Sequence, residues 1–379
     1  MSKEANIIVL GASARAAAFS ALRAGMRPYA IDLFADSDLA DVCPAVKISR
    51  YPQDFEQALT EAPQAPWIYT GGLENYPDLV ERMSALRPLY GNGAEVLRRV
   101  RDPELLADCL ARADSNFEMP EIRRSPPTSD YGHWLVKPRH SSGGLGIRRA
   151  QAHESPADQE RFYYQQFVPG TCRSAVYLAQ RGHCTVVGMT DQQCGLIDFP
   201  NQPFLYAGSA LAGSSEFDLI EELGKVVAVE FGLRGFFNVD YIDHGISIFP
   251  LEINPRYSAS VEILEHSRGT NFLAMHVAEF DPDFQGETRC WISRCPRHVA
   301  KRIVYAPCDC TVTPELNRLR RKWNVELLLP CLADIPHSGD RILRGQPVVT
   351  VIAEGASDAA VQQVLEERVN AVKQAILPA

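Results

Sequence analysis

The chain has 379 residues, of which 46% are hydrophobic and 22% are charged, and its formal net charge is −9. This composition is typical of a globular protein with two or three domains, and the negative charge disfavours a nucleic-acid surface, which needs a basic face. The longest apolar runs, such as 5–12 and 347–353, are too short to span a bilayer, and residues 1–4 lead straight into a strand without signal-peptide regions. We therefore expect a cytoplasmic protein with no membrane segment.

The first 95 residues predict a doubly wound parallel sheet, because short buried strands alternate with amphipathic helices. A tight turn at Gly11 separates the first strand from the first helix, and Gly25 stands where a helix C-cap glycine belongs. The predicted strands are 6–10, 28–33 and 67–70, and the predicted helices are 13–24, 51–59 and 77–86.

The first strand-to-helix turn is similar to a dinucleotide-binding fingerprint. Asp32 follows Gly11 at a suitable spacing, but Ser13 replaces the second glycine that the fingerprint requires. This departure favours a module that does not bind NAD, and an NAD-linked oxidoreductase stays the less favoured alternative.

Ligands bind at the carboxyl ends of strands in such sheets, so the loops after the first and third strands carry substrate candidates. An ordinary connecting loop, with its asparagine near a helix N-cap, is an equally good interpretation of the second loop. The candidates are Ser13, Arg15, Gly72, Glu74 and Asn75.

A helical pattern over 93–113 leads into the central region, where a Pro- and Ser-rich loop precedes a strand that ends at Lys137. The loop after this strand contains Ser142, Gly143, Gly144 and Gly146. Glycines let backbone N–H groups approach phosphate oxygens, and Lys137 adds a positive charge. The segment therefore predicts a phosphate-binding flap, although a glycine-rich hairpin without a ligand is an equal alternative.

Strands dominate from 131 to 215. The polar stretch 191–193 is expected to be a loop, and the alternative is that it faces the cleft for the acceptor substrate. A helix over 216–231 precedes two predicted strands, 235–242 and 246–254. The remainder predicts helices over 269–279 and 357–376, with short strands around 299–305 and 348–353.

The two strands at 235–254 carry the residues most indicative of chemistry. Period-two alternation places Glu252 and Asn254 on one face, and Asp240 lies on the preceding strand. Carboxylate and amide oxygens are ligands that Mg²⁺ prefers, and the planar guanidinium of Arg256 matches a phosphate or an oxyanion. The alternatives are a strand-end Asp240 without a ligand and a purely structural salt bridge at Arg256.

Taken together, these motifs resemble the ATP-grasp superfamily of carboxylate–amine and carboxylate–thiol ligases. The resemblance implies ATP and Mg as cofactors, with Asp240, Glu252 and Asn254 as metal ligands and Lys137 and Arg256 as catalytic residues. It also implies that Lys137, Ser142 and the flap glycines contact the phosphates. The segment Gln165, Gln166, Phe167 and Val168 matches the family's adenine-binding hinge.

The resemblance implies an α/β and α+β fold: a Rossmann-like pre-ATP-grasp domain at 1–95, an ATP-grasp domain at 96–280 and a C-terminal α+β extension at 281–379. Within the ATP-grasp domain we expect a flap subdomain at about 131–170 and a metal-binding subdomain at about 171–280. The opening, 70–75 and 334–348 segments are similar to a sub-branch described as predicted ATP-dependent carboligases related to biotin carboxylase.

Two positions depart from the family pattern. The run Arg101-Asp102-Pro103 lacks the lysine that contacts a phosphate in many members, so that contact is absent or passes to Arg101. Cys172 stands near the point where many members place a glutamate on the ribose. Both departures concern nucleotide affinity or choice more than the metal site.

The expected function is that of a ligase that activates a carboxylate as an acyl phosphate and joins it to an amine. We expect small-molecule carboxylate and amine substrates from cofactor or small-metabolite biosynthesis, an amino-acid ligation such as glutamate to an amine being one example. A homodimer is the family-level expectation. A non-catalytic nucleotide-binding regulatory protein is the main alternative.

Overall fold

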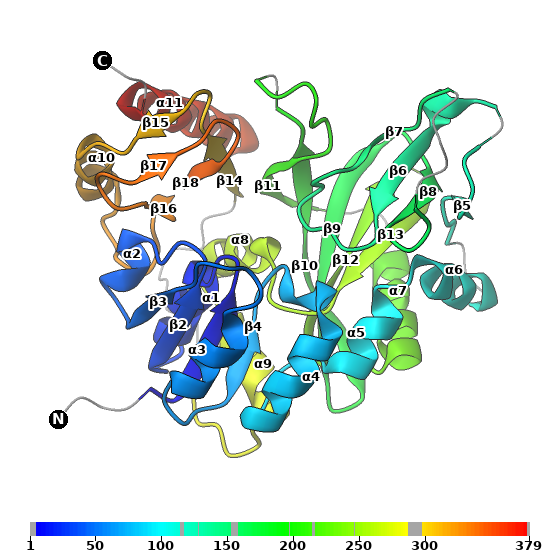
Figure 1. The fold of residues 1–379 in the computed structure, drawn as a ribbon, viewed down its shortest axis with the longest axis horizontal. Coiled ribbons are helices and arrows are strands. Elements are labelled where there is room, and N and C mark those ends of the chain that lie inside the picture. The colour runs from blue at the N-terminus through cyan, green and yellow to red at the C-terminus, as the bar shows by residue number, and fades with distance from the viewer. Residues whose placement is uncertain are drawn as a thin grey trace.

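The computed structural model describes residues 5–113, 117–127, 129–152, 158–196, 198–213, 217–245, 247–286 and 298–376. Within these ranges the strands form four sheets: a four-stranded parallel sheet, a large eight-stranded sheet, a small four-stranded sheet and a two-stranded ribbon. Figure 1 shows the first sheet (blue) beside the C-terminal segment (orange to red), with the small sheet (teal) on the other side of the large one.

The parallel sheet has the strand order β3-β2-β1-β4. Its strands and helices are β1 (Ile7–Gly11), α1 (Arg15–Arg23), β2 (Pro28–Asp32), α2 (Ser37–Ala40), β3 (Ala45–Lys47), α3 (Phe55–Glu61), β4 (Trp67–Tyr69) and α4 (Pro77–Leu86). Prediction and structure agree on the three main strands and three main helices, whereas α2 and β3 are too short to leave a periodic pattern.

Both faces of this sheet are buried. Ile7 and Val9 of β1 pack in one core with residues of α1, whereas Ile8 and Leu10 pack in a second core with residues of α3 and α4. Because successive side chains of a strand point to opposite faces, a strand that is apolar throughout requires helices on both sides. The predicted doubly wound sheet is confirmed.

The helical pattern predicted over 93–113 is interrupted. It forms two helices, α5 (Ala94–Val100) and α6 (Pro103–Arg112). The side chain of Asp102 accepts hydrogen bonds from the N–H groups of Glu104 and Leu105, which makes it the N-cap of α6, and Pro103 occupies the first helical position, where no N–H is needed. The Arg101-Asp102-Pro103 run is therefore a helix boundary.

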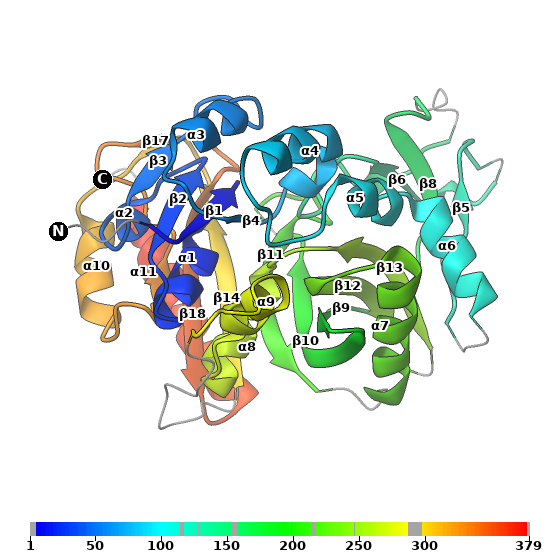
Figure 2. The ribbon, with the colours of Figure 1, turned by 90° about the horizontal axis from the view of Figure 1, so that it is seen from below.

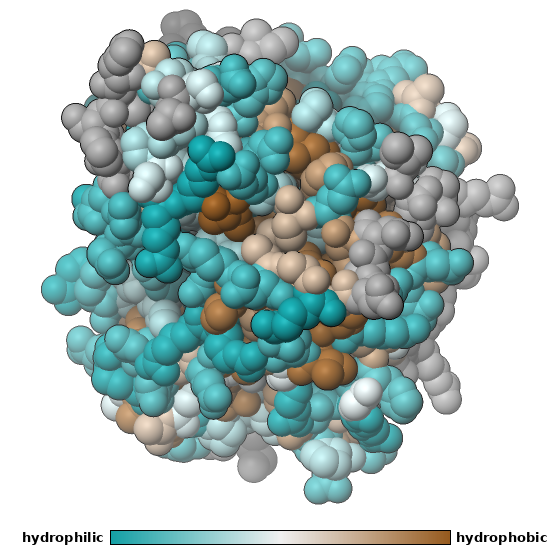
Figure 3. All heavy atoms as spheres, turned by 90° about the vertical axis from the view of Figure 1, so that its right-hand side faces the viewer, coloured by the Kyte–Doolittle hydropathy of each residue, from teal (hydrophilic) through white to brown (hydrophobic). Residues whose placement is uncertain are grey.

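The small sheet has the order β5-β8-β6-β7. Its strands are β5 (Ile122–Arg123), β6 (Trp134–Pro138), β7 (Arg148–Arg149) and β8 (Phe162–Gln166). Figure 3 shows the molecule from this side, where apolar residues (brown) gather between hydrophilic ones (teal).

The large sheet has the order β13-β12-β9-β10-β11-β14-β18-β16, and all its neighbours are antiparallel. Its strands are β9 (Thr171–Gln180), β10 (His183–Cys194), β11 (Tyr206–Ala212), β12 (Gly235–Asp243), β13 (Ile248–Asn254), β14 (His298–Tyr305), β16 (Leu332–Ala333) and β18 (Pro347–Gly355). The stretch 191–193, expected to be a loop, lies in β10. That expectation is wrong, because pairing with β9 and β11 satisfies its backbone groups whatever its side chains.

Helices cover the large sheet along its length, and α7 packs mainly against β10 (Figure 2). They are α7 (Phe217–Phe231), α8 (Ala259–Arg268), α9 (Phe272–Phe280), α10 (Glu315–Trp323) and α11 (Asp358–Ile376), and the ribbon is β15 (Cys310–Thr311) with β17 (Arg341–Ile342). The prediction missed α8, and the helix expected at 269–279 corresponds to α9. The boundary at 281 stays a prediction, with β14, β16 and β18 continuing the sheet that β9–β13 begin.

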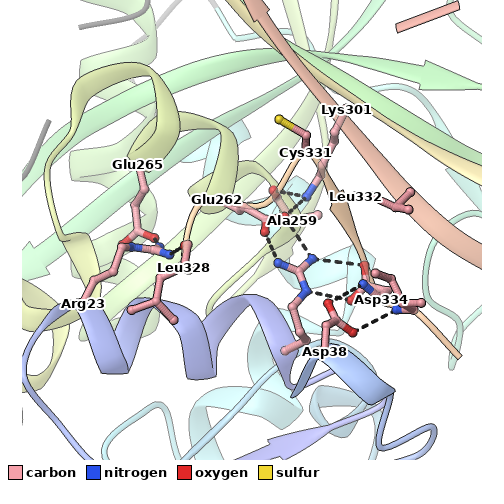
Figure 4. A network of polar contacts seen from close by, with 12 residues as sticks. Arg23, Asp38, Ala259, Glu262, Glu265, Lys301, Leu328, Cys331, Leu332 and Asp334 are labelled. Carbon is pink, nitrogen blue, oxygen red and sulfur yellow. Dashed lines mark hydrogen bonds and ion pairs between the residues drawn. The ribbon is translucent and has the colours of Figure 1, made fainter. Parts of the chain in front are cut away.

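A buried ionic network joins α1, α8, β14 and the segment at Asp334. The guanidinium of Arg15, only 2% exposed, donates to Glu262 and to both carboxylate oxygens of Asp334, and Lys301 Nζ donates to Glu262 Oε2 at 3.1 Å. Figure 4 shows Glu262, Lys301 and Asp334 converging on this point. Asp38 accepts from the N–H of Asp334 at 2.9 Å, which holds the C-terminal segment against the first sheet.

Among the described residues, no helix is both long enough and apolar enough to cross a membrane.

Candidate active site

A cavity of about 600 Å³ runs between the small sheet, the large sheet and the carboxyl end of the first sheet. This volume lies in the range of small-molecule sites. Fourteen of the predicted site residues line it. They are Ser13, Arg15, Lys137, Ser142, Gly143, Gly144, Gln165, Gln166, Phe167, Val168, Asp240, Glu252, Asn254 and Arg256.

The predicted metal residues come together because of the pairing of β12 with β13. Asp240 lies directly opposite Glu252, and Asn238 lies opposite Asn254. Asn254 Nδ2 donates to Asp240 Oδ2 at 3.0 Å. Residues directly opposite in an antiparallel pair share a face, so these side chains all point to the same side of the sheet.

The two adjacent carboxylates, Asp240 and Glu252, have shifted pKa values at this end of the cavity. Burial, and next the charge of Glu252, raise the pKa of Asp240 to about 7. Burial acts to raise the pKa of Glu252 as well, but Arg101 and Lys137 outweigh it, and that pKa is lowered. Glu252 is therefore the carboxylate that stays ionised, and a bound cation would stabilise the ionised form of Asp240 as well.

These residues fit a divalent cation. Carboxylate and amide oxygens are its preferred ligands, and Asp240 keeps lone-pair capacity beyond its bonds from Gln192, Asn238 and Asn254. Asn254 presents its oxygen to Arg256 and its nitrogen to Asp240, so the amide has to turn to offer oxygen to a metal. In the described part of the chain no three His, Cys, Asp or Glu side chains cluster as a metal site, and a cation here would have two carboxylates and the amide oxygen of Asn254 as side-chain ligands.

Lys137 lies at the end of β6, 7% exposed, and its Nζ donates to Gln165 Oε1 at 3.0 Å. Burial acts to lower the pKa of Lys137, but Tyr163 and Glu252 raise it on balance, so the side chain stays an ammonium. A charged, buried ammonium in the same cavity as the carboxylates is suited to phosphate oxygens.

The flap glycines pack closely on the segment before β11. The carbonyl of Gly143 accepts from Tyr206 N–H at 2.9 Å, and a Cβ on Gly144 would lie 1.8 Å from the carbonyl oxygen of Phe204. Gly144 also has a φ of 76°, which side chains rarely adopt. Gly146 does not line the cavity, and its predicted phosphate contact stays a prediction.

The predicted adenine hinge lies at the end of β8, and two of its amides are already in use. The N–H of Gln166 donates to Glu121 O at 2.8 Å, and that of Phe167 donates to His133 O at 2.7 Å. The resemblance implies that backbone groups near Gln166, Phe167 and Val168 read the adenine edge, and that role stays a prediction.

Arg256 faces the cavity and also forms a largely buried salt bridge, so its position fits both a ligand-binding and a structural role. It lines the cavity, and its Nη2 donates to Glu74 Oε1 at 2.8 Å and to Asn254 Oδ1 at 2.9 Å. Glu74 is 1% exposed and follows β4. Glu74 and Gly72 do not line the cavity, so a part in substrate binding would pass through Arg256.

Asn75 does not line the cavity either. Its Nδ2 donates to the carbonyl of Ser141 at 3.2 Å, and Arg101 Nη2 donates to the same carbonyl at 3.1 Å. Arg101 Nη1 also reaches Glu252 Oε2 at 3.4 Å. Asn75 and Arg101 therefore hold the start of the flap at Ser141, and Arg101 links it to Glu252.

Asp32 is used inside the first sheet. Its carboxylate, 2% exposed, accepts from the N–H groups of Ala14, Phe34 and Ala35. These bonds engage the oxygens that would bind a ribose in an NAD-binding protein.

Three side chains that line the cavity have a buried polar atom with no partner among the described residues. These atoms are Gln165 Nε2, Asn238 Oδ1 and Ser258 Oγ. Of the three residues, only Gln165 was predicted from the sequence. Ser258 is the N-cap residue of α8 beside Arg256, so its hydroxyl and the helix N-terminus favour an anion there. Buried polar atoms without partners are rare, which marks the cavity as a place for a polar ligand.

Part of the chain matches a known protein family. Residues 105–260 match the model of a family described as an ATP-grasp domain. No curated protein matches the sequence.

Several solved structures share the fold at low identity. L-amino acid ligase from Bacillus licheniformis has a TM-score of 0.69 and 13% identity, with 98% of each chain covered. The biotin carboxylase domain of Hydrogenobacter thermophilus 2-oxoglutarate carboxylase, a dimer in complex with MgADP, ADP and bicarbonate, has a TM-score of 0.66 and 12% identity, with 100% of this chain and 91% of that chain covered. Pyruvate carboxylase from Rhizobium etli has a TM-score of 0.67 and 13% identity over 96% of this chain, which spans 37% of the pyruvate carboxylase chain. The predicted fold class is confirmed.

Proposed function

We propose that the chain is a member of the ATP-grasp superfamily and an ATP- and Mg-dependent ligase that joins a small-molecule carboxylate to an amine. The observation that carries this proposal is the gathering of Asp240, Glu252 and Asn254 in one cavity with the buried ammonium of Lys137. L-amino acid ligase from Bacillus licheniformis, similar in fold, supports an amino acid as one substrate.

ATP fits as a co-substrate between the flap and the large sheet. Lys137, Ser142 and the flap amides would bind its phosphates, and Val168 its base. Mg²⁺ held by Asp240, Glu252 and Asn254 would neutralise phosphate charge when bound. The start of the flap, fixed by Arg101 and Asn75, keeps the glycine loop over the phosphates and excludes water, which would hydrolyse an activated substrate.

The carboxylate substrate fits beside Arg256 and Ser258. In the proposed reaction its oxygen attacks the γ-phosphorus of ATP, which releases ADP and gives an acyl phosphate. The amine then attacks the acyl carbon, phosphate leaves, and the amine loses a proton. Arg256, held in place by Glu74, would stabilise the oxyanion that develops at the acyl carbon.

The domain boundaries near 95 and 280 and a homodimer remain part of this proposal. The dimeric biotin carboxylase domain from Hydrogenobacter thermophilus supports the homodimer. The cytoplasm, where ATP is made available, stays the predicted location, and cofactor or small-metabolite biosynthesis the predicted context.

The test is release of ADP from MgATP by the purified protein, with pools of amino acids, other carboxylates and amines. We expect ADP release only when a carboxylate and an amine are both present, together with a new amide product by mass spectrometry. Glu252→Gln should lower turnover by about a hundredfold or more, since it removes a charged metal ligand. Glu56→Gln, on the exposed side of α3, is the matched control.

Near-normal ligation by Glu252→Gln would contradict the metal role. Tight nucleotide binding without ADP release in any pool would instead favour the non-catalytic regulatory protein.

A further inference from the structure

Two cysteines lie side by side at the nucleotide end of the cavity. Cys172 belongs to β9, and Cys194 is the last residue of β10, the neighbouring antiparallel strand. The register sets Asp191 opposite Arg173, so Cys172 comes next to Gln192, and Cys194 follows two residues later on the same face. Both cysteines line the cavity together with Asp240.

The two thiols are accessible and close enough to affect each other. Cys194 is exposed and Cys172 is partly exposed. The Cys172 thiol lowers the pKa of Cys194, against the opposing effect of burial. The other described cysteines, among them Cys184 on the same strand as Cys194, do not line the cavity.

Cys194 lies at a place where the strand pairing is irregular. It is the last residue of β10, and the pairing of β10 with β11 shifts there because β11 has one extra residue, Ala207. Cys194 is a diagonal neighbour of Cys172, so formation of an S–S bond requires this strand end to move toward Cys172.

Cys172 is also connected to the metal residues. Its thiol donates to Gln192 Oε1 at 3.3 Å, and Gln192 Nε2 donates to Asp240 Oδ1 at 2.9 Å. The side-chain amide of Gln192 therefore links the sulfur of Cys172 to the carboxylate of Asp240.

We propose that Cys172 and Cys194 form a dithiol site that a peroxide oxidises reversibly to a disulfide. One thiol is first oxidised by hydrogen peroxide to a sulfenic acid, with release of one water. The second thiol then attacks this sulfur, the S–S bond forms, and a second water leaves. Two thiols and one hydrogen peroxide thus give one disulfide and two waters, and an added dithiol reverses the reaction.

The disulfide removes the S–H donor to Gln192 and ties the ends of β9 and β10 together inside the cavity. We expect this to weaken nucleotide binding, a consequence that rests on the proposed function. Formation of the disulfide itself does not depend on that function.

The experiment treats the full-length reduced protein with hydrogen peroxide, with and without MgADP. Peptide mass mapping should find a Cys172–Cys194 link that lacks two hydrogens, and dithiothreitol should remove it. MgADP present beforehand should slow its formation. Cys172→Ser and Cys194→Ser should each abolish the link, whereas Cys184→Ser should retain it.

Calorimetric titration of reduced and oxidised protein with MgADP supplies the second readout. We expect affinity to fall by about tenfold or more on oxidation and to recover on reduction. Oxidation of other cysteines without a Cys172–Cys194 link would overturn the site. A link with unchanged affinity would overturn its effect on binding. Failure of the reduced protein to bind nucleotide would contradict the proposed function, and the peptide map would still decide the dithiol site.

Discussion

Replacing Arg15 by methionine tests whether the buried ionic network holds the modules together. Arg15 donates to Glu262 and, at 2.9 and 3.0 Å, to both carboxylate oxygens of Asp334. Methionine has a similar length and suits a buried position, so the substitution removes the charge and its hydrogen bonds more than it removes packing.

The expected loss of unfolding free energy depends on which partners Glu262 and Asp334 keep when Arg15 is replaced. Glu262 keeps Lys301 at 3.1 Å, but Asp334 loses both hydrogen bonds to the guanidinium, and its side chain is only 22% exposed. Removing one partner of a buried ion pair costs roughly 3–5 kcal/mol, and the remaining lysine places the expected loss near the lower limit, at about 3 kcal/mol. Arg82→Met, which breaks an ion pair between side chains that are 55% and 39% exposed, should cost about 0–1 kcal/mol.

The pH dependence gives the reasoning a second check. Burial acts to raise the pKa of Glu262, but Arg15 and Lys301 outweigh it and hold that pKa well below its ordinary value of 4.5. A carboxyl whose pKa is depressed in the folded state stabilises the protein above the unfolded pKa, and this contribution is lost as the pH falls. The difference between wild type and Arg15→Met should therefore shrink as the pH falls below about 4.5.

The assay is urea denaturation of wild type, Arg15→Met and Arg82→Met, followed by circular dichroism and tryptophan fluorescence at pH 7.5 and at pH 4 and below. The free energy of the first unfolding transition is compared. Equal losses for the two variants at pH 7.5 would refute the argument, because they would mean that burial adds nothing to the value of the Arg15 network.

Three further predictions concern the cavity. Gly144→Ala should weaken MgADP binding by about tenfold or more, because its Cβ would lie 1.8 Å from a carbonyl oxygen. The control is Gly182→Ala, since Gly182 has a similar φ of 79° but lies in open space. Equal calorimetric affinities of the two variants for MgADP would contradict a close approach at Gly144. Because the pKa of Asp240 is raised from 3.8 to about 7, this group costs the ligand-free protein stability progressively as the pH rises from about 3.8 to 7, and the cost is constant above 7, where the carboxylate is ionised. MgADP affinity should accordingly fall up to about tenfold per unit below pH 7, and a calorimetric affinity equal at pH 6 and pH 8 would count against a metal at this carboxylate. Arg101→Met, which frees the start of the flap, should raise KM for ATP by about tenfold, and steady-state kinetics with unchanged KM would exclude that role.

The sequence predicted the elements whose signal is local. The apolar strand at Ile7–Gly11 and the helix at Pro77–Leu86 follow from periodicity and cap residues, and both were located to within a residue or two. The break between α5 and α6 was overlooked, although Asp followed by Pro is typical of an N-cap and a first helical residue. Helix α8 was missed because it follows the Glu252-to-Arg256 motif directly and its residues are buried nearly all round, which leaves no amphipathic stripe.

Residues of the site divide in the same way. Asp240, Glu252 and Asn254 lie on two adjoining strands, so alternation and a hairpin were sufficient to predict that they share a face. Gln192 was placed in a loop, because only pairing with β9 and β11 reveals that it donates to Asp240. Nothing in its local sequence carries that information.

By itself, the sequence determined most of the strands and helices, the glycine loop after Lys137 and the shared face of Glu252 and Asn254 at the end of β13, since each depends on neighbours within a few residues. Only the tertiary structure decided that Glu74 holds Arg256, that Asn75 and Arg101 hold the flap, and that Arg15 joins α1 to α8 and Asp334. These contacts join residues up to 319 positions apart, and burial makes their charges interact strongly. Periodicity and local propensity carry no record of such distant pairings.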